Sequence, residues 1–202
     1  MPNGGWQCNP PPSSCFIGEQ VRHYRQPARL FPVAMPATPD DLFAYLDRLG
    51  IAHRTVRHPP LFTVEQSQAL RGQIPGGHTK NLFLKDKKGA LFLVVALEDA
   101  AITLKTLHHH LGAGRFSFGP AELLEETLGV VPGSVTPFGA LNDTGRRVTI
   151  VLDTAMMAHD SLNFHPLVNT MTTTIARDDL LKFLAATGHV PRIVPVSDDG
   201  GE

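Results

Sequence analysis

The chain has 202 residues, 42% of them hydrophobic, and a formal net charge of −1. This length and apolar content are enough for one substantial core and favour a single domain. A net charge close to zero argues against a protein that coats nucleic acid nonspecifically, because that mode of binding needs many phosphate contacts. No run approaches the roughly 18 apolar residues that cross a bilayer, and the start lacks the regions of a secretory signal, so we expect a soluble, cytoplasmic protein.

Residues 1–37 are rich in proline, glycine and glutamine and show neither a helix nor a strand period. This composition predicts a disordered or loosely attached extension before a domain at 38–195, with a flexible tail at 196–202. Met35 is a candidate natural start. Both cysteines, Cys8 and Cys15, lie in the extension, and their spacing indicates neither a metal site nor a disulfide framework. We expect reduced thiols without a function.

The domain begins with a helix signal at Thr38-Pro39-Asp40-Asp41, which combines a capping hydroxyl, a proline in the first turn and two acids at the positive end of the helix. Further elements are predicted from apolar periodicity and from turn residues. They are a strand at 52–56, a short helix at 64–70, a hairpin of strands at 82–84 and 90–97, helices at 101–111, 120–128 and 177–187, and strands at 147–152 and 170–175. This irregular alternation predicts a mixed α/β (α+β) domain around one mixed, largely antiparallel sheet.

Lys80 and Asn81 stand at the predicted mouth of the first hairpin strand, after the glycine pair at 76–77. A lysine there can hold a phosphate as a point charge, while the glycines allow a ligand to approach the backbone. An ordinary surface lysine is the alternative. The glycine pair fits no nucleotide-binding fingerprint.

The segment Gly133-Ser134-Val135-Thr136-Pro137 places two hydroxyl groups between a glycine and a proline. Its backbone dipoles can polarise an ester, as hydrolysis requires, although the segment is equally interpretable as a connecting turn. Ser134 is a poor candidate for a nucleophile, because no Gly-x-Ser-x-Gly elbow and no adjacent His–Asp pair are evident.

His165 precedes Pro166, which favours an extended backbone, and Asn169 adds a polar group shortly after it. A histidine held at a strand end can donate a hydrogen bond, position water or shape a pocket, whereas a lone histidine is more often structural. The triplet at 108–110 predicts no metal site, since successive helical side chains point about 100° apart. We therefore expect neither a metal nor another cofactor.

Charge is unevenly distributed along the chain. Between Arg54 and Lys105 there are eight lysines and arginines and four acids. Such a basic patch can receive the end of an RNA, although a charge cluster is more often a solvated face.

The motifs His58-Pro59-Pro60, Lys80-Asn81, 133–137 and His165-Pro166 with Asn169 occur here in that order. In order and spacing they resemble the YbaK and prolyl-tRNA-synthetase insertion-domain superfamily, most closely its freestanding ProXp-ala (PrdX) type. The resemblance spans about residues 42–194. It implies a YbaK-type fold and hydrolysis of Ala-tRNA(Pro), an error of prolyl-tRNA synthetase.

The resemblance also implies roles for individual residues. Lys80 would bind the tRNA 3′ end, Gly133 would place the substrate carbonyl and water, and His165 would line the amino-acid pocket. The remaining substrate-binding positions are Asn81, Ser134, Thr136, Pro137, Pro166 and Asn169.

Two alternatives stay open at this point. One is a deacylase of the same fold with another small acyl group, cysteine or serine. The other is a module that binds tRNA or prolyl-tRNA synthetase without catalysis, which the basic patch and the lack of an obvious acid–base pair allow.

Overall fold

The computed structural model describes residue 1, residues 35–60 and residues 74–197. The two cysteines, most of the extension at 1–37 and the helix expected at 64–70 lie outside the described residues. The predicted domain boundaries therefore stay predictions. No helix in the described part of the chain is long and apolar enough to cross a membrane.

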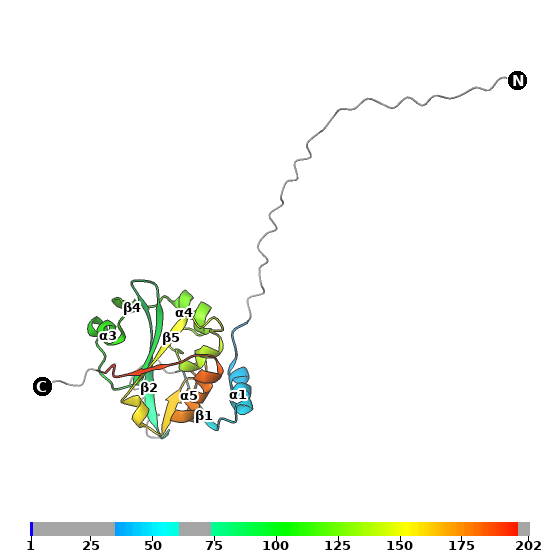
Figure 1. The fold of residues 1–202 in the computed structure, drawn as a ribbon. Helices are drawn as coiled ribbons and strands as arrows, with labels where there is room; N and C mark the ends of the chain where they lie inside the picture. Colours follow the sequence, from blue (N-terminus) through cyan, green and yellow to red (C-terminus); the bar gives the residue numbers. More distant parts are fainter. Residues whose placement is uncertain (2–34, 61–73, 198–202) are drawn as a thin grey trace. The chain divides into compact units, whose positions relative to one another are not determined.

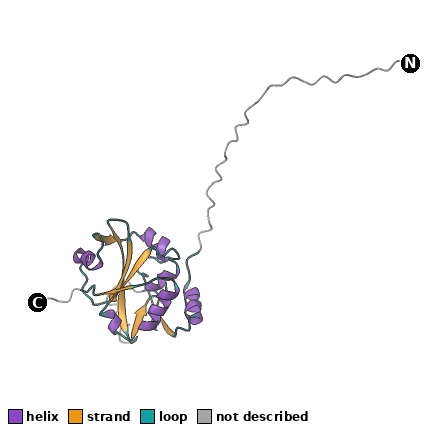
Figure 2. Ribbon diagram, in the orientation of Figure 1, coloured by secondary structure: helices purple, strands orange, loops and turns teal. Residues whose placement is uncertain are grey.

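A mixed sheet of eight strands occupies the centre of the described fold (Figures 1 and 2). Seven strands follow the order β1-β7-β6-β2-β3-β5-β8, and β4 pairs with β2. Three of the described strand pairs, β2–β6, β3–β5 and β5–β8, are parallel, and the other four are antiparallel. This confirms the mixed, largely antiparallel sheet. The strands are β1 (His53–Arg57), β2 (Gly77–Asp86), β3 (Leu91–Leu97), β4 (Phe116–Phe118), β5 (Val148–Asp153), β6 (Ser161–Phe164), β7 (Met171–Ala176) and β8 (Arg192–Val194).

Helices cover both faces of the sheet, and each face has its own apolar cluster. The larger cluster joins the sheet to α1 (Pro39–Arg48), α4 (Ala121–Leu128), α5 (Arg177–Ala186) and the 3₁₀ helix η1 (Pro137–Leu141). The smaller cluster joins the opposite face to α3 (Leu104–Leu111). We call these two sides of the sheet the α5 face and the α3 face. A second 3₁₀ helix, η2 (Met156–Ala158), follows β5.

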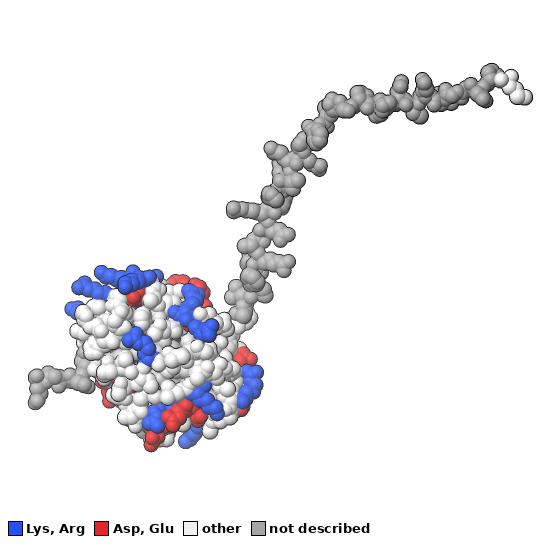
Figure 3. Space-filling model, in the orientation of Figure 1, with Lys and Arg blue, Asp and Glu red and all other residues white. Residues whose placement is uncertain are grey.

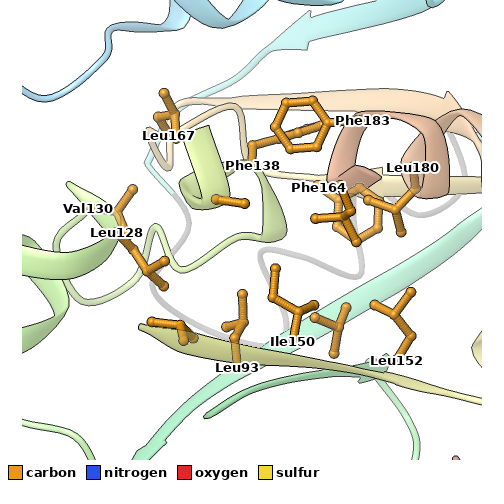
Figure 4. Packing of buried hydrophobic residues seen from close by; sticks show 14 of the residues in the cluster. Leu93, Leu128, Val130, Phe138, Ile150, Leu152, Phe164, Leu167, Leu180 and Phe183 are labelled. Atoms are coloured by element: carbon orange, nitrogen blue, oxygen red, sulfur yellow. The ribbon is translucent and has the colours of Figure 1, made fainter. Parts of the chain in front are cut away.

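Strand alternation assigns each strand residue to one of the two faces. In β3, Leu93 belongs to the α5 face and Val94 to the α3 face, and both are fully buried. Figure 4 shows Leu93, with Ile150 and Leu152 of β5, across from three phenylalanines that include Phe138. These aromatic rings pack edge to face: Phe138 lies 5.3 Å from Phe183 and 5.7 Å from Phe164 between ring centroids. This packing fixes η1, and with it the loop before it, against the sheet.

The N-terminal cap of α1 is as predicted from the sequence. The Thr38 hydroxyl accepts the Asp41 N–H at 3.2 Å, and the Asp41 carboxylate accepts the Thr38 N–H at 2.9 Å. Just before the helix, the Ala37 N–H donates to Asn142 Oδ1 at 2.8 Å. This last contact attaches the start of α1 to the body of the domain.

One prediction about β2 is wrong. The strand begins at Gly77 and not near Leu82, so Lys80 and Asn81 lie inside the strand and not at its mouth. The first half of β2 is polar and lacks the apolar signal of a strand. Its backbone is nevertheless paired with β3 from Thr79 onward and with β6 at Gly77 and His78, which extends the strand.

Candidate active site

The candidate site lies where strands β2 and β6 separate. These parallel strands pair at only two positions, Gly77 with Leu162 and His78 with Asn163. Past these pairs the strands separate, and β2 is joined on the same edge by β4 only from Leu84 onward. We call the gap between residues 79–83 of β2 and residues 164–169 the fork. The fork opens beyond the carboxyl end of β6, while β2 continues to Asp86. Ligands of α/β sheets commonly bind outside the carboxyl ends of strands, so the fork is a candidate place for a site.

Lys80 and His165 occupy matching positions on the two sides of the fork. Each lies two residues beyond the last strand pair, His78 with Asn163. Lys80 shares its face of β2 with Leu82 and Leu84, which belong to the α3 cluster. His165 alternates with Phe164, which belongs to the cluster on the α5 face. Both side chains therefore project on the α3 face, as a shared site requires.

Asn81 projects from β2 on the opposite face from its neighbour Lys80, since successive strand residues alternate. Its Oδ1 is buried and has no hydrogen-bond partner among the described residues. The two adjacent polar residues that the sequence singled out thus approach the fork from different faces of the sheet.

Two backbone carbonyl groups fix the histidine tautomers at the site. His165 Nδ1 lies 3.0 Å from the Met171 carbonyl oxygen, and His58 Nδ1 lies 2.8 Å from the Pro59 carbonyl oxygen. A carbonyl oxygen only accepts, so each Nδ1 carries a proton, and Nε2 is the acceptor when the ring is in its neutral form. His58 Nε2 is used by the Thr172 hydroxyl at 2.9 Å. Within the described part of the chain no residue is hydrogen-bonded to His165 Nε2, which leaves this nitrogen for a ligand.

Burial lowers the pKa of His165 below its ordinary value, because the charged imidazolium loses solvation. The hydrogen bond to Met171 acts in the opposite direction, and the charge of His58 lowers the pKa further. The His58 and His165 ring centroids are 6.3 Å apart. His165 is therefore an uncharged acceptor at neutral pH.

Lys80 is half-buried, and its ammonium group donates to the Ala100 carbonyl oxygen. An ammonium group has three donors, so this contact directs the side chain and leaves two donors for a phosphate. Ala100 shortly precedes α3, which links Lys80 to that helix.

The glycine loop and Asn169 are neighbours in the structure. Gly133 is exposed with φ +88°, and a Cβ placed on it would lie 3.8 Å from Asn169 Nδ2. The rest of the loop is engaged in the fold. Ser134 and Pro137 are buried, and the fully buried Thr136 accepts the Phe138 N–H at 3.3 Å to cap η1.

The chain turns sharply directly after His165. The Leu167 N–H donates to the His165 carbonyl oxygen at 3.0 Å, and Leu167 has φ +67°, which is uncommon for a residue other than glycine. Pro166 and Leu167 are both buried. The sequence did not predict this turn or the hydrogen bond of the Thr172 hydroxyl to His58 Nε2, and it indicated His58 only as part of a motif. Nothing in the local pattern marks a left-handed leucine.

Metal binding finds no support in this region. Within residues 35–60 and 74–197 no group of three or more His, Cys, Asp or Glu side chains is arranged to hold an ion. The neighbouring rings of His108 and His109, with centroids 3.9 Å apart, lie on α3 and not in the fork.

Comparison with known proteins assigns the domain to a family. Residues 58–183 match the family model of the aminoacyl-tRNA editing domain. The chain belongs to this family. Editing domains of this kind are deacylases, so the protein is a hydrolase that acts on the ester of an aminoacyl-tRNA.

The editing domain is similar to two curated proteins over most of its length. It is 40% identical over 156 residues to prolyl-tRNA synthetase associated domain-containing protein 1 of Danio rerio, covering 76% of this chain and 85% of that protein. It is 35% identical over 149 residues to the prolyl-tRNA editing protein ProX of Acetoanaerobium sticklandii, covering 73% and 91%.

Among solved structures, a candidate trans-editing enzyme for prolyl-tRNA synthetase superposes with a TM-score of 0.62. The two chains are 18% identical, and the match covers 84% of this chain and 99% of the other. At this identity the likeness concerns the fold, and it confirms the expected YbaK-like architecture.

Proposed function

We propose that this protein hydrolyses mischarged tRNA(Pro) in trans, in the cytoplasm, and that alanine is its preferred acyl group. The fork is the observation that carries the proposal, because it brings Lys80 and His165 to matching positions on one face of the sheet. The name of the ProX relative supports tRNA(Pro) as the carrier, and the sequence resemblance to ProXp-ala supports alanine.

The reaction is an ester hydrolysis. Water adds to the carbonyl carbon, and the tetrahedral intermediate collapses by breaking the bond to the ribose oxygen. One proton of the water ends on that ribose oxygen, the other is released to solvent, and the free amino acid leaves as its carboxylate. The ester is already activated, so orientation and stabilisation of the developing oxyanion suffice without a covalent nucleophile.

Each catalytic candidate has a distinct role in this proposal. Lys80 binds a phosphate of the tRNA 3′ end with its two remaining donors. His165 lines the acyl pocket, where its neutral Nε2 accepts a hydrogen bond from the substrate's amino group. Gly133 allows the loop backbone to approach the reacting centre, and Asn169 supports the loop from the His165 side. Asn81 and Pro166 border the fork between them.

A basic surface on the described domain suits the tRNA partner. Figure 3 shows lysine and arginine side chains gathered over the end of the sheet near β4 and α3. Lys87 and Lys88 in the β2–β3 turn and Arg115 before β4 are exposed there. Lys105 and Arg115, with histidines of α3, line a depression of about 390 Å³. Phosphates of the acceptor stem would bind on this surface while the 3′ end enters the fork.

A prolyl-tRNA synthetase is a second proposed partner, and the name of the Danio rerio relative supports it. Such an association would place the editing domain close to the source of mischarged tRNA. Trans-editing itself requires only that the released tRNA be captured.

The test is a panel of initial rates. Purified protein is incubated with Ala-, Cys-, Ser- and Pro-tRNA(Pro), and amino-acid release is followed. We expect fastest release from Ala-tRNA(Pro), no release from Pro-tRNA(Pro), and strongly reduced rates for Lys80→Ala and His165→Ala. Faster release of cysteine or serine would reassign the acyl group, because one methylene in a pocket changes selectivity by only about 1–3 kcal/mol. Intact ester with measurable tRNA binding would instead establish a binding module.

A further inference from the structure

Backbone groups of β2 face the fork in a regular order. The His78 carbonyl oxygen accepts the Glu98 N–H on the β3 side, at 2.9 Å. The Phe83 carbonyl oxygen accepts the Gly119 N–H next to β4, also at 2.9 Å, on the opposite edge. Because main-chain groups of successive strand residues point to alternate edges, even-numbered residues of β2 face β3 and odd-numbered ones face the fork. The Asn81 N–H and C=O therefore point into the gap.

The carbonyl group that a regular strand pair would offer to the Asn81 N–H is bonded elsewhere. If the parallel register of His78 with Asn163 continued, the Asn81 N–H would donate to the His165 carbonyl oxygen. That oxygen accepts the Leu167 N–H at 3.0 Å instead, in the turn where Leu167 takes φ +67°. No described strand pairs with residues 79–83 on this edge. The backbone strain at Leu167 thus coincides with the opening of the fork.

The side chain of Asn81 is also available to a ligand. Asn81 Oδ1 is buried without a hydrogen-bond partner among the described residues. A buried acceptor without a partner is costly, and the main-chain N–H of the same residue has no strand partner within residues 35–60 and 74–197. A polar ligand in the fork can satisfy both groups. By the strand register, this N–H points from β2 toward the His165 turn on the other side of the fork.

We propose that the main-chain N–H of Asn81 donates to the ester carbonyl oxygen of the aminoacyl group and stabilises the oxyanion that forms when water adds. This assignment rests on the proposed deacylase function and deepens it. It moves the oxyanion contact from the glycine loop to the strand edge, and it leaves Gly133 with the placement of the attacking water. A strand held by β3 on its other edge is rigid, as a preorganised donor must be.

The test compares Asn81→Pro with Asn81→Ala. Both variants lose the side chain, but only proline also removes the N–H, and proline is tolerated where a strand N–H faces an unpaired edge. We expect kcat of Asn81→Pro for Ala-tRNA(Pro) to be about 100- to 1000-fold below that of Asn81→Ala, as for loss of an oxyanion donor, with KM changed less than about threefold. Equal kcat values for the two variants, both folded by circular dichroism and thermal unfolding, would overturn the assignment.

A second variant covers the case in which Asn81→Pro does not fold. Replacing Asn81 by its α-hydroxy analogue turns the N–H into an ester oxygen and keeps the side chain and the strand geometry. The same loss of kcat is expected, and an unchanged kcat would refute the assignment.

A binding measurement separates the two proposals. In the unaltered protein, the ¹⁵N–¹H resonance of Asn81 should shift when the amide-linked alanyl analogue of the terminal adenosine is added. If the unaltered protein releases no alanine, the proposed function fails and the oxyanion assignment fails with it. If it releases alanine while neither the kcat ratio nor the Asn81 resonance behaves as expected, only the assignment fails.

Discussion

Gly133 offers a test with a matched control elsewhere in the chain. Gly133 has φ +88°, and Gly89 in the β2–β3 turn has φ +89°. A Cβ on Gly133 would meet only Asn169 Nδ2, at 3.8 Å, an ordinary contact, and a Cβ on Gly89 would meet nothing within 4 Å. Alanine should therefore cost the same backbone strain at both sites, about 1–2 kcal/mol, because the steric difference is negligible.

The two substitutions should differ in activity. Gly133→Ala relieves its strain by shifting the exposed loop at the fork, and a displacement of about 1 Å in a positioning group can cost about 100-fold in rate. We expect kcat/KM for Ala-tRNA(Pro) to fall about 10- to 100-fold in Gly133→Ala and to stay within about twofold of the parent in Gly89→Ala.

Urea unfolding provides the stability comparison, and alanine release from charged tRNA provides the rate. Each kcal/mol corresponds to about 2–4 °C in Tm for a domain of this size. Two results would refute the reasoning: full activity in Gly133→Ala, or a loss of stability in Gly133→Ala that exceeds the loss in Gly89→Ala by more than about 1 kcal/mol.

Three further predictions follow from buried and charged groups. Asp143 accepts the Val148 N–H at 2.8 Å and faces His189 Nε2 at 3.2 Å, so Asp143→Ala should lose about 3–5 kcal/mol in chemical unfolding, and a loss below 1 kcal/mol contradicts this. Burial lowers the pKa of His165, so its NMR titration should have a midpoint below about 6.5. As pH falls below about 6.5, the unfolded chain binds a proton at this histidine before the folded chain does, which destabilises the parent. His165→Gln lacks this group and should lose less stability than the parent over the same pH range; an equal loss would contradict the lowered pKa. Lys80→Ala should raise KM more than it lowers kcat, whereas a kcat effect alone would assign Lys80 to the chemical step.

The sequence predicted those elements that carry their own local signals. The Thr38 cap of α1 acts within one turn, and the hairpin of β2 and β3 consists of two apolar runs that are close in sequence. The first half of β2 carries no such signal. Its strand conformation comes from pairing with β6 and β3, segments distant in sequence, and no local propensity reports that pairing.

The site was predictable in its residue types more than in its geometry. Lys80, Gly133 and His165 were selected from the sequence, and their roles in catalysis stay predictions. In the structure Lys80 and His165 lie on the two sides of the fork, and Gly133 lies close to Asn169. The opposite directions of Lys80 and Asn81 follow from strand alternation, but only once β2 is known to begin at Gly77. The turn at Leu167 depends on its burial in the core, which compensates for an unfavourable φ.

A crystal structure with a non-hydrolysable substrate analogue tests the location of the site most directly. The ligand is the terminal adenosine of tRNA carrying alanine through an amide in place of the ester. The account predicts the alanyl group in the fork, with Lys80 at the phosphate side and His165 Nε2 within hydrogen-bond distance of the amino group. An alanyl group bound outside the fork, with neither side chain in contact, would contradict it.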